Sequence, residues 1–149
     1  MENKERFKLI PLVGLILIKE DKILLLRRFQ TGFEDGKYSF IAGHVDGNES
    51  MTEAMAREAK EEAGIIIDPG KLKHTLTMHR KHNGHETIQC YFKAEDWIGE
   101  PKNVEPDKCD DMQWFSIDKI PQNIVSWSDK AIECYQKGIH YYEFGWERK

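Results

Sequence analysis

The sequence predicts an α+β fold in which a mixed β-sheet packs against helices that lie outside it. Most of the apolar segments are short runs or alternating patterns typical of strands, whereas only residues 51–63 and 128–137 have helical character. No internal repeat, low-complexity tract or Pro/Gly/Ser-rich linker interrupts the 149 residues. We therefore expect residues 1–149 to form a single domain with a substantial core.

The first two elements are expected to form a hairpin of buried strands. Residues 9–18 and 22–28 are rich in Ile, Leu and Val, and the polar sequence KED separates them. The first run also resembles a signal peptide in outline, because charged residues precede it. However, Glu2 and Glu5 lie in the lead-in, Pro11 lies early in the run, and ten residues are too few to span a membrane. A strand in a cytoplasmic protein without a membrane partner is the favoured interpretation.

The next two elements are a short strand and a helix. The loop FQTGFEDG leads to a strand at 38–41. Ser50 and Glu53 have the spacing of a capping box, and Gly64 is suited to the left-handed conformation that ends a helix. The sequence therefore predicts a helix over 51–63.

The second half of the chain is expected to be mainly strand. Residues 73–82 and 85–92 flank an Asn-Gly pair, which is the strongest short hairpin signal. A further strand is expected at 111–116, followed by a helix over 128–138. We expect the aromatic tail HYYEFGW to dock on the domain.

Charge and cysteine content restrict the class of partner and the compartment. The net charge is −4, and no segment gathers Lys and Arg into a sustained basic face, which disfavours nucleic acid as a partner. Cys90, Cys109 and Cys134 are odd in number and form no C-x-x-C pair, as expected for buried thiols in a reducing compartment.

Three glutamates crowd the end of the predicted helix at 51–63. Glu58, Glu61 and Glu62 share one helical face, although acidic side chains near a helix C-terminus cost about 0.3–1 kcal/mol each. Hard oxygen donors at this spacing suit Mg²⁺ or Mn²⁺, and Mg²⁺ commonly completes its shell with waters and phosphates. The alternative is a solvated helix face held by salt bridges. On the acidic turn alone, both interpretations stay open.

Arg57 lies beside these glutamates. It can pair with Glu53 or Glu61 at helical spacing, or with Glu49 in the preceding loop. The last of these pairs would hold the loop against the helix.

The segment that begins at Gly43 resembles the Nudix box, G-x5-E-x7-R-E-U-x-E-E-x-G-U, where U is aliphatic. All fixed positions match, and the matching residues are Gly43, Glu49, Arg57, Glu58, Ala59, Glu61, Glu62, Gly64 and Ile65. The strands before the box and the hairpin after it also follow the Nudix order. One departure lies upstream, where many members have Pro-Gly-Gly and this chain has Ile41-Ala42-Gly43. The resemblance implies a Nudix-type α/β/α sandwich with a mixed sheet and the box helix beside it.

The resemblance also implies hydrolysis of a nucleoside diphosphate linked to another group. Carried over by position, Glu58, Glu61 and Glu62 would ligate Mg²⁺, or alternatively Mn²⁺, helped by the backbone carbonyl of Gly43. A metal ion neutralises the diphosphate and lowers the pKa of a bound water, which then attacks phosphorus.

The implied catalytic group consists of these glutamates and Arg57. Arg57 and Glu49 would orient the box, and Glu58 is our first choice for assisting the attacking water. Some members use a carboxylate outside the box instead. The candidates in this chain are Glu105, Asp107, Asp110 and Asp111, each of which is otherwise an ordinary loop acid. Glu105 is the candidate for an additional contact with substrate or metal.

The substrate branch is inferred from markers outside the box. The ADP-ribose branch usually has a proline about fifteen residues beyond the box, and residues 75–85 contain none. The tyrosine of the dinucleoside polyphosphate branch and the coenzyme A signature are also missing. The remaining branch is the short, MutT-like one that converts a nucleoside triphosphate to the monophosphate and pyrophosphate. EPKNVEPDK, followed by MQWF, also resembles a segment of some nucleotide diphosphatases of that branch.

Two other functions stay open. One is a Nudix hydrolase of another diphosphate, such as a nucleotide sugar. The other is a nucleotide-binding sensor that has lost turnover, although such proteins tend to lose a box glutamate and this chain keeps all of them. A homodimer is compatible with the branch.

A base-binding wall would need aromatic side chains with a few polar groups. Candidates are Phe33, Tyr38, Phe40 and Trp97, for each of which ordinary packing is the competing interpretation. His79, His82 and His85 suggest zinc at first sight, but strand alternation would scatter their rings, so a hairpin is favoured.

Overall fold

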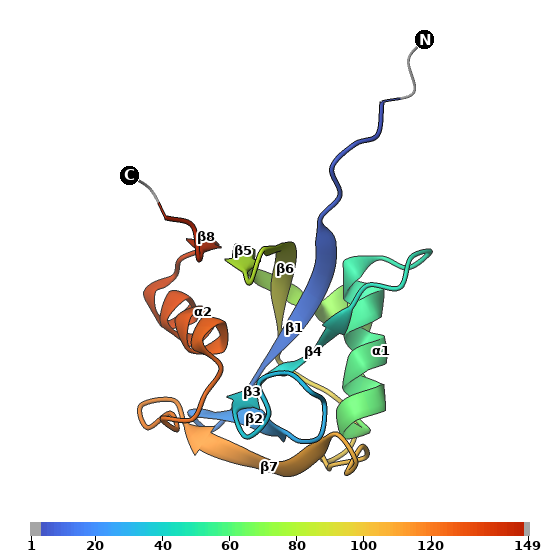
Figure 1. The fold of residues 1–149 in the computed structure, drawn as a ribbon. Helices are drawn as coiled ribbons and strands as arrows, with labels where there is room; N and C mark the ends of the chain where they lie inside the picture. The colour runs from blue at the N-terminus through green and yellow to red at the C-terminus, as the bar shows by residue number, and fades with distance from the viewer. Residues whose placement is uncertain (1–3, 148–149) are drawn as a thin grey trace.

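A mixed eight-stranded sheet lies between two helices in the computed structural model, which describes residues 4–147 (Figure 1). This arrangement confirms the predicted α+β class. The elements in chain order are β1 (Ile10–Lys19), β2 (Lys22–Arg28), β3 (Tyr38–Ser39), β4 (Ile41–His44), α1 (Met51–Ala63), the 3₁₀ turn η1 (Pro69–Lys71), β5 (Lys73–His82), β6 (His85–Ala94), β7 (Cys109–Ser116), α2 (Ser126–Lys137) and β8 (Tyr141–Phe144).

Strand β1 connects the two parts of the sheet. It pairs in parallel with β6 over Ile10–Leu17 and antiparallel with β4 over Leu12–Leu15, but it meets β2 only at Ile18 and Lys19. Strand β2 then pairs with β3 and β7, while β6 continues through β5 to β8. The sheet therefore divides along β1, and its two parts diverge beside β4.

Each face of the sheet has its own hydrophobic core. Leu15 and Leu17 of β1 belong to the cluster under α1, whereas Ile16 between them belongs to the cluster under α2. Strand β2 divides in the same way, with Leu24 on one face and Ile23 on the other. This alternation is why residues 12–18 and 23–26 are apolar, since strand segments covered on both faces are apolar throughout.

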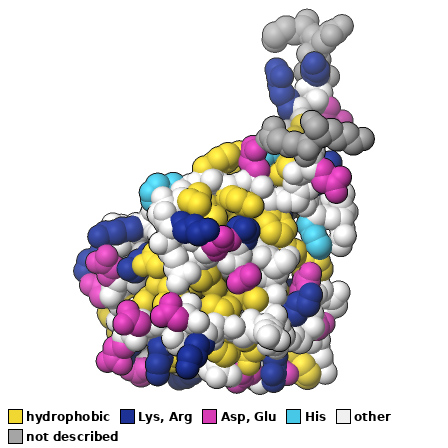
Figure 2. All heavy atoms as spheres, turned by 90° about the vertical axis from the view of Figure 1, so that its left-hand side faces the viewer, with side chains coloured by type: hydrophobic (Ala, Val, Ile, Leu, Met, Phe, Trp, Pro, Cys, Tyr) yellow, Lys and Arg dark blue, Asp and Glu magenta, His cyan; other side chains and the backbone are white. Residues whose placement is uncertain are grey.

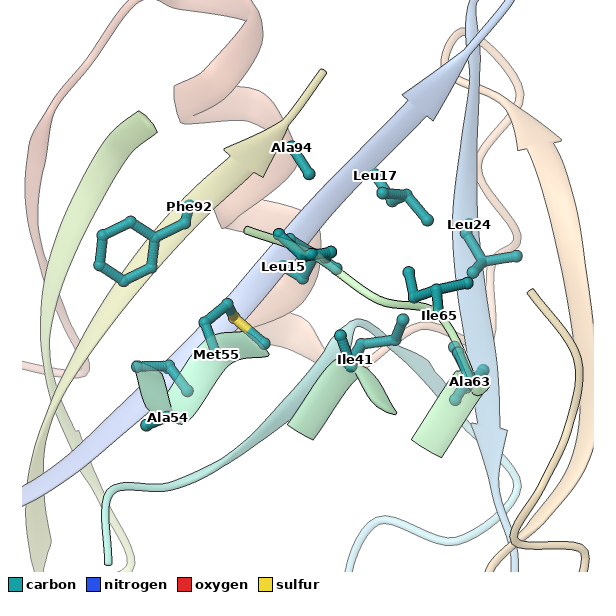
Figure 3. Packing of buried hydrophobic residues seen from close by; sticks show 14 of the residues in the cluster. Leu15, Leu17, Leu24, Ile41, Ala54, Met55, Ala63, Ile65, Phe92 and Ala94 are labelled. Carbon is teal, nitrogen blue, oxygen red and sulfur yellow. The ribbon is translucent and has the colours of Figure 1, made fainter. Parts of the chain in front are cut away.

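The helix α1 has the bounds that its local sequence predicts. Ser50 and Glu53 form the reciprocal capping box, and Gly64 ends the helix in the left-handed conformation at φ 68°. Its buried face is made of small residues and Met55, which lie opposite Leu15 and Ile41 (Figure 3). The helix therefore lies close to the sheet, with its charged residues toward β4 and solvent.

Both predicted hairpins are present. Glu20 and Asp21 have φ values of 52° and 62°, and Asn83 and Gly84 have values of 51° and 77°. Two consecutive positive φ angles are typical of the turns whose twist matches a hairpin. Strand β1 begins and ends one residue later than expected, and β6 extends two residues further, to Ala94.

The strand expected at 38–41 is wrong in its bounds. The chain passes from one part of the sheet to the other at Phe40, so Tyr38 and Ser39 pair with β2 and the next strand, β4, pairs with β1. A pattern of four residues contains no information about this change of partner.

Two later elements also begin earlier than expected. Strand β7 starts at Cys109, because its pairing with β2 continues past a β-bulge, with Asp111 opposite Arg27 and Cys109 opposite Arg28. Helix α2 starts at Ser126 with Val125 as its N-cap, and no side chain caps it, so its start lacks a local sequence signal.

The aromatic tail docks, as expected, and does so as a strand. Strand β8 pairs in parallel with β5, from Thr77 opposite Tyr141 to Arg80 opposite Phe144. The indole of Trp146 donates a hydrogen bond to the carbonyl of His79 at 3.2 Å. This pairing extends the sheet beyond the hairpin that carries part of the cleft described below.

The three cysteines are free thiols, with Cys109 and Cys134 buried. No helix within residues 4–147 is long and apolar enough to cross a membrane. On the face shown in Figure 2, basic and acidic side chains are intermixed with hydrophobic ones and do not separate by sign.

Candidate active site

A cleft of about 840 Å³ runs from the glutamates of α1 to a group of aromatic side chains on the α2 side of the sheet. Glu58, Glu61 and Glu62 line its acidic end, together with the backbone at Gly43. The aromatic end is lined by Phe33, Phe40, Arg80, His82, Gln89 and Trp127. One cavity therefore joins hard oxygen donors to flat apolar surfaces.

Arg57 holds the acidic end in position. Its Nε and Nη2 atoms donate to the two carboxylate oxygens of Glu49, both at 2.9 Å, and Nη2 also donates to the carbonyl of His44 at 3.0 Å. Hydrogen bonding to Arg57 lowers the pKa of Glu49 to about 2. This two-bond contact between Arg57 and Glu49 fixes the loop before α1 against the helix. It is one of the three pairings of Arg57 that the sequence allows.

The third nitrogen of Arg57 faces the glutamates. Nη1 donates to Glu58 at 3.0 Å and to the carboxylate of Glu61 at 3.3–3.4 Å. Glu53, the other predicted partner, instead accepts a hydrogen bond from the backbone of Ser50. One guanidinium therefore orients two of the three glutamates.

Glu58 and Glu62 are carboxylates in a poorly hydrated position. The Glu58 side chain is 14% exposed, and Glu62 accepts a hydrogen bond from the Ala42 backbone at 3.0 Å. Burial raises the pKa of Glu58, and burial together with the Glu58 charge raises the pKa of Glu62 well above its ordinary value. Arg57 and the Ala42 backbone compensate these two charges only in part, so a cation at this end would stabilise both.

The chemistry of this donor set fits a hard divalent cation. Glu61 is half exposed, at 52%, and accepts hydrogen bonds from Arg57, while the Glu58 side chain is more deeply buried in the cleft. Gly43 has no side chain at a point where a Cβ atom would lie 2.2 Å from Cδ of Glu58. The described residues hold no preformed group of three acids, His or Cys close enough for a metal.

The aromatic end is built on the β5–β6 hairpin and α2. Phe33 stacks on Trp127 with centroids 5.9 Å apart, and His82 meets the same indole edge-on at 4.8 Å. The guanidinium carbon of Arg80 lies 4.3 Å from the centre of the Trp127 ring. Two side chains of β5 and one from the loop before β3 thus surround one indole.

Comparison with known proteins agrees with this geometry. The model of the NUDIX domain family matches residues 8–135. The chain belongs to the Nudix family. An oxidized purine nucleoside triphosphate hydrolase of Danio rerio is 31% identical over 131 residues, which cover 81% of this chain and 75% of that protein.

Other relatives of this Nudix chain differ in substrate. An ADP-ribose pyrophosphatase of Methanocaldococcus jannaschii is 32% identical over 141 residues, covering 91% of this chain and 79% of that protein. The chain spans only 39% of the length of a matching NAD-capped RNA hydrolase. Among solved structures, the MutT NUDIX hydrolase from Burkholderia pseudomallei superposes with a TM-score of 0.79 at 27% identity, covering 85% of this chain and 98% of that one.

The acids outside the Nudix box are not equivalent in the structure. Glu105 lines the cleft, and its charge contributes to the raised pKa of Glu62, after burial and Glu58. Asp110 instead pairs with Arg27 at 2.7 Å, and Asp111 accepts hydrogen bonds from the hydroxyl of Tyr38 and from Gln113. Asp107 is exposed. The structure therefore brings only Glu105 of these four acids to the Nudix cleft.

The predicted wall residues divide in the same way. Phe33 and Phe40 line the Nudix cleft. Tyr38 packs edge-on against Phe115 in the core, and Trp97 stacks on Trp114 with centroids 6.4 Å apart, so the structure places these two elsewhere.

The three histidines lie on different faces of the hairpin. His79 packs against Trp146 at 4.7 Å, whereas His82 and His85 line the Nudix cleft as a cross-strand pair. Strand alternation separates His79 from the other two.

Sequence reasoning missed Arg80, Gln89 and Trp127 as lining residues. The sequence does contain a signal for Arg80. Leu76, Met78 and Arg80 occupy alternate positions of β5, so their side chains lie on one face, which changes from apolar to charged toward the hairpin turn. Trp127 has no such pattern, since its position depends on how α2 packs across the sheet.

Proposed function

We propose that this chain is a Mg²⁺-dependent Nudix hydrolase that converts a nucleoside triphosphate to the monophosphate and pyrophosphate. The observation that carries the proposal is the single cleft in which the box carboxylates face aromatic walls. Its size suits a nucleotide, whose charged and flat parts match the two ends.

The metal would be held by Glu58, Glu61, Glu62 and the carbonyl of Gly43, with Mn²⁺ as an alternative ion. When bound, the metal ion would neutralise the charge of the phosphate oxygens and lower the pKa of a water molecule bound to it. The donors are hard oxygens only, which is the preference of both ions.

The protein's own groups perform the remaining tasks. Glu58 accepts the proton of the attacking water, and burial raises its pKa, which makes the carboxylate a stronger base. Water oxygen bonds to phosphorus while the anhydride P–O bond breaks, and pyrophosphate leaves with that electron pair. Arg57 keeps Glu58 and Glu61 oriented, and Glu49 keeps Arg57 in place.

Cations outside the box would bind the phosphates. Arg28 and Lys108 line the same cleft, and the charge of Arg28 partly offsets the raised pKa of Glu62. Glu105 lies near enough to contact the metal or a phosphate-bound water. These groups come from β2 and from the loop before β7, opposite the box helix.

The ADP-ribose pyrophosphatase relative supports a second candidate, the hydrolysis of a nucleotide conjugate such as ADP-ribose or a nucleotide sugar. The missing proline marker favours the triphosphate instead. We also propose a free nucleotide rather than capped RNA, because the net charge is −4 and no segment gathers Lys and Arg into a sustained basic face. The free thiols suit the cytoplasm.

The test is phosphate release with Mg²⁺ from a panel of nucleoside triphosphates, with and without an added pyrophosphatase, and from nucleotide conjugates with an added alkaline phosphatase, which releases phosphate from the two monoesters that a cleaved conjugate gives. We expect release only with the added pyrophosphatase and only from triphosphates. Glu61→Gln and Glu62→Gln should lower turnover about a hundredfold or more, whereas Glu95→Gln, which removes an exposed charge paired with Lys73, should not. Turnover of a conjugate alone would establish the second candidate, and binding without turnover would establish a sensor.

A further inference from the structure

Arg80 is a buried cation at the floor of the cleft. Only 7% of the residue is exposed, and its Nη1 donates to the side-chain carbonyl of Gln89 at 2.7 Å. Within residues 4–147, no carboxylate forms an ion pair with it. Burying an arginine without a counter-charge is unfavourable, so its retention at this point of the cleft indicates a ligand.

The residues around Arg80 fix its direction. The Gln89 amide donates to the carbonyl of Val13 at 3.1 Å, and the Tyr91 hydroxyl donates to the same Gln89 oxygen that Arg80 uses. Burial raises the pKa of Tyr91, which therefore stays neutral and provides no counter-charge. Gly14 leaves room for this network, because a Cβ there would lie 2.8 Å from the Tyr91 ring.

A second polar group beside Arg80 lacks a hydrogen-bond partner among the described residues. Thr87 lies opposite Arg80 in the β5–β6 ladder and lines the cleft. Its hydroxyl oxygen is buried and has no hydrogen-bond partner in the described part of the chain. Unpaired buried polar atoms are rare, so a ligand that reaches this floor would satisfy two groups at once.

The surroundings indicate the kind of group that binds. Trp127 lies against the guanidinium, and Phe33 and Phe40 line the same end of the cleft. Flat apolar walls suit an aromatic ring rather than a phosphate, and Arg28 and Lys108 are available for phosphates beside the box. A guanidinium offers donors only, so the ring must present acceptors.

We propose that Arg80 is a specificity-determining residue that binds the keto edge of the substrate's base. The proposal rests on the nucleotide hydrolase function proposed above and deepens it. Hypoxanthine, guanine and uracil carry a carbonyl oxygen at this edge and accept from the guanidinium. Adenine and cytosine carry an amino group there. This group is a hydrogen-bond donor, so it would face the donors of the guanidinium and form no hydrogen bond with them.

Inosine and adenosine monophosphates provide the sharpest comparison, since their bases differ only at this edge. A good paired contact between arginine and a base edge discriminates by about 5- to 150-fold. We therefore expect the protein to bind IMP at least about fivefold more tightly than AMP, and UMP more tightly than CMP.

The test is calorimetric titration of the full chain with IMP and AMP in the presence of Mg²⁺. Arg80→Met should abolish the preference, with most of the loss in IMP binding. Arg80→Lys should retain only part of it, because a single ammonium cannot make a paired contact. Lys81→Met is the matched control, since this neighbouring cation lies over Trp146 on the opposite face of β5. It should keep the wild-type ratio.

Equal weakening of IMP and AMP by Arg80→Met would overturn the proposal, as would a wild-type protein that binds AMP as well as IMP. Thermal melting separates these results from unfolding, because removal of an unpaired buried charge should leave the melting temperature unchanged or raise it. The binding ratio does not depend on turnover. A keto preference in a protein that cleaves no triphosphate would therefore support the role of Arg80 while overturning the proposed reaction.

Discussion

Glu62→Gln tests the electrostatic account of the acidic end most directly. The substitution keeps the shape of the side chain and an oxygen that can accept from the Ala42 backbone, but it removes the charge. In the wild type without metal, desolvation and repulsion by the Glu58 charge both destabilise the ionised Glu62 carboxylate. The metal-free variant should therefore be more stable than the wild type at neutral pH.

The size and pH dependence of this gain follow from the burial. Leaving a buried polar group without full compensation costs about 1–3 kcal/mol, and one kcal/mol shifts the melting temperature of a domain of this size by about 2–4 °C. The expected rise is therefore about 2–12 °C. A raised folded-state pKa means that the penalty grows as pH rises and disappears when the carboxyl is protonated. The gain should be largest at about pH 8 and vanish near 4.5, the ordinary pKa.

The assay is thermal unfolding of wild type and variant in a chelator across this pH range, followed by the same measurement with Mg²⁺. Added Mg²⁺ should stabilise the wild type and have little effect on the variant, which reverses their order. Glu95→Gln, at an exposed position, should show neither effect. A variant less stable than the wild type in chelator at pH 8 would refute the reasoning and make Glu62 a structural residue.

Two further substitutions test the positions around Glu58. Gly43→Ala places a Cβ 2.2 Å from Cδ of Glu58, so turnover should fall about a hundredfold with little change in melting temperature. Gly70→Ala is the control, because its Cβ would lie 3.4 Å from the nearest atom, and it should leave the steady-state kinetics unchanged. Glu49→Gln removes the paired acceptor of Arg57 and should lower turnover about 10- to 100-fold; unchanged kinetics would mean that Arg57 needs no anchor. Because the pKa of Glu49 is lowered to about 2, its stabilising effect is complete above 4.5 and is lost as pH falls toward 2, so acid unfolding profiles of wild type and variant should converge there.

Features with a local cause could be predicted from the sequence. The helix at 51–63 depends on Ser50, Glu53 and Gly64, all within its own turns, and the hairpin at 83–84 depends on its Asn-Gly pair. The side chains of the acidic end follow from helical spacing in the same way.

Features with a distant cause could not be predicted. The break at Phe40 arises because the chain changes partner strands, and the strand at 141–144 exists because β5 offers it an edge. The aromatic end of the cleft depends on Trp127 crossing the sheet to reach Arg80. No window of neighbouring residues contains these pairings, although strand alternation places Arg80 on the inner face of β5.

The parallel pairing of β8 with β5 has a consequence for synthesis of the chain on the ribosome. Until residues 141–144 emerge, β5 is an open edge whose backbone groups can pair with another nascent chain. The strand that carries Arg80 thus completes its hydrogen bonding after every other element of the sheet has been made. Late docking of this short segment covers residues 77–80 of β5 and leaves the four-residue strand β8 as the edge of the sheet.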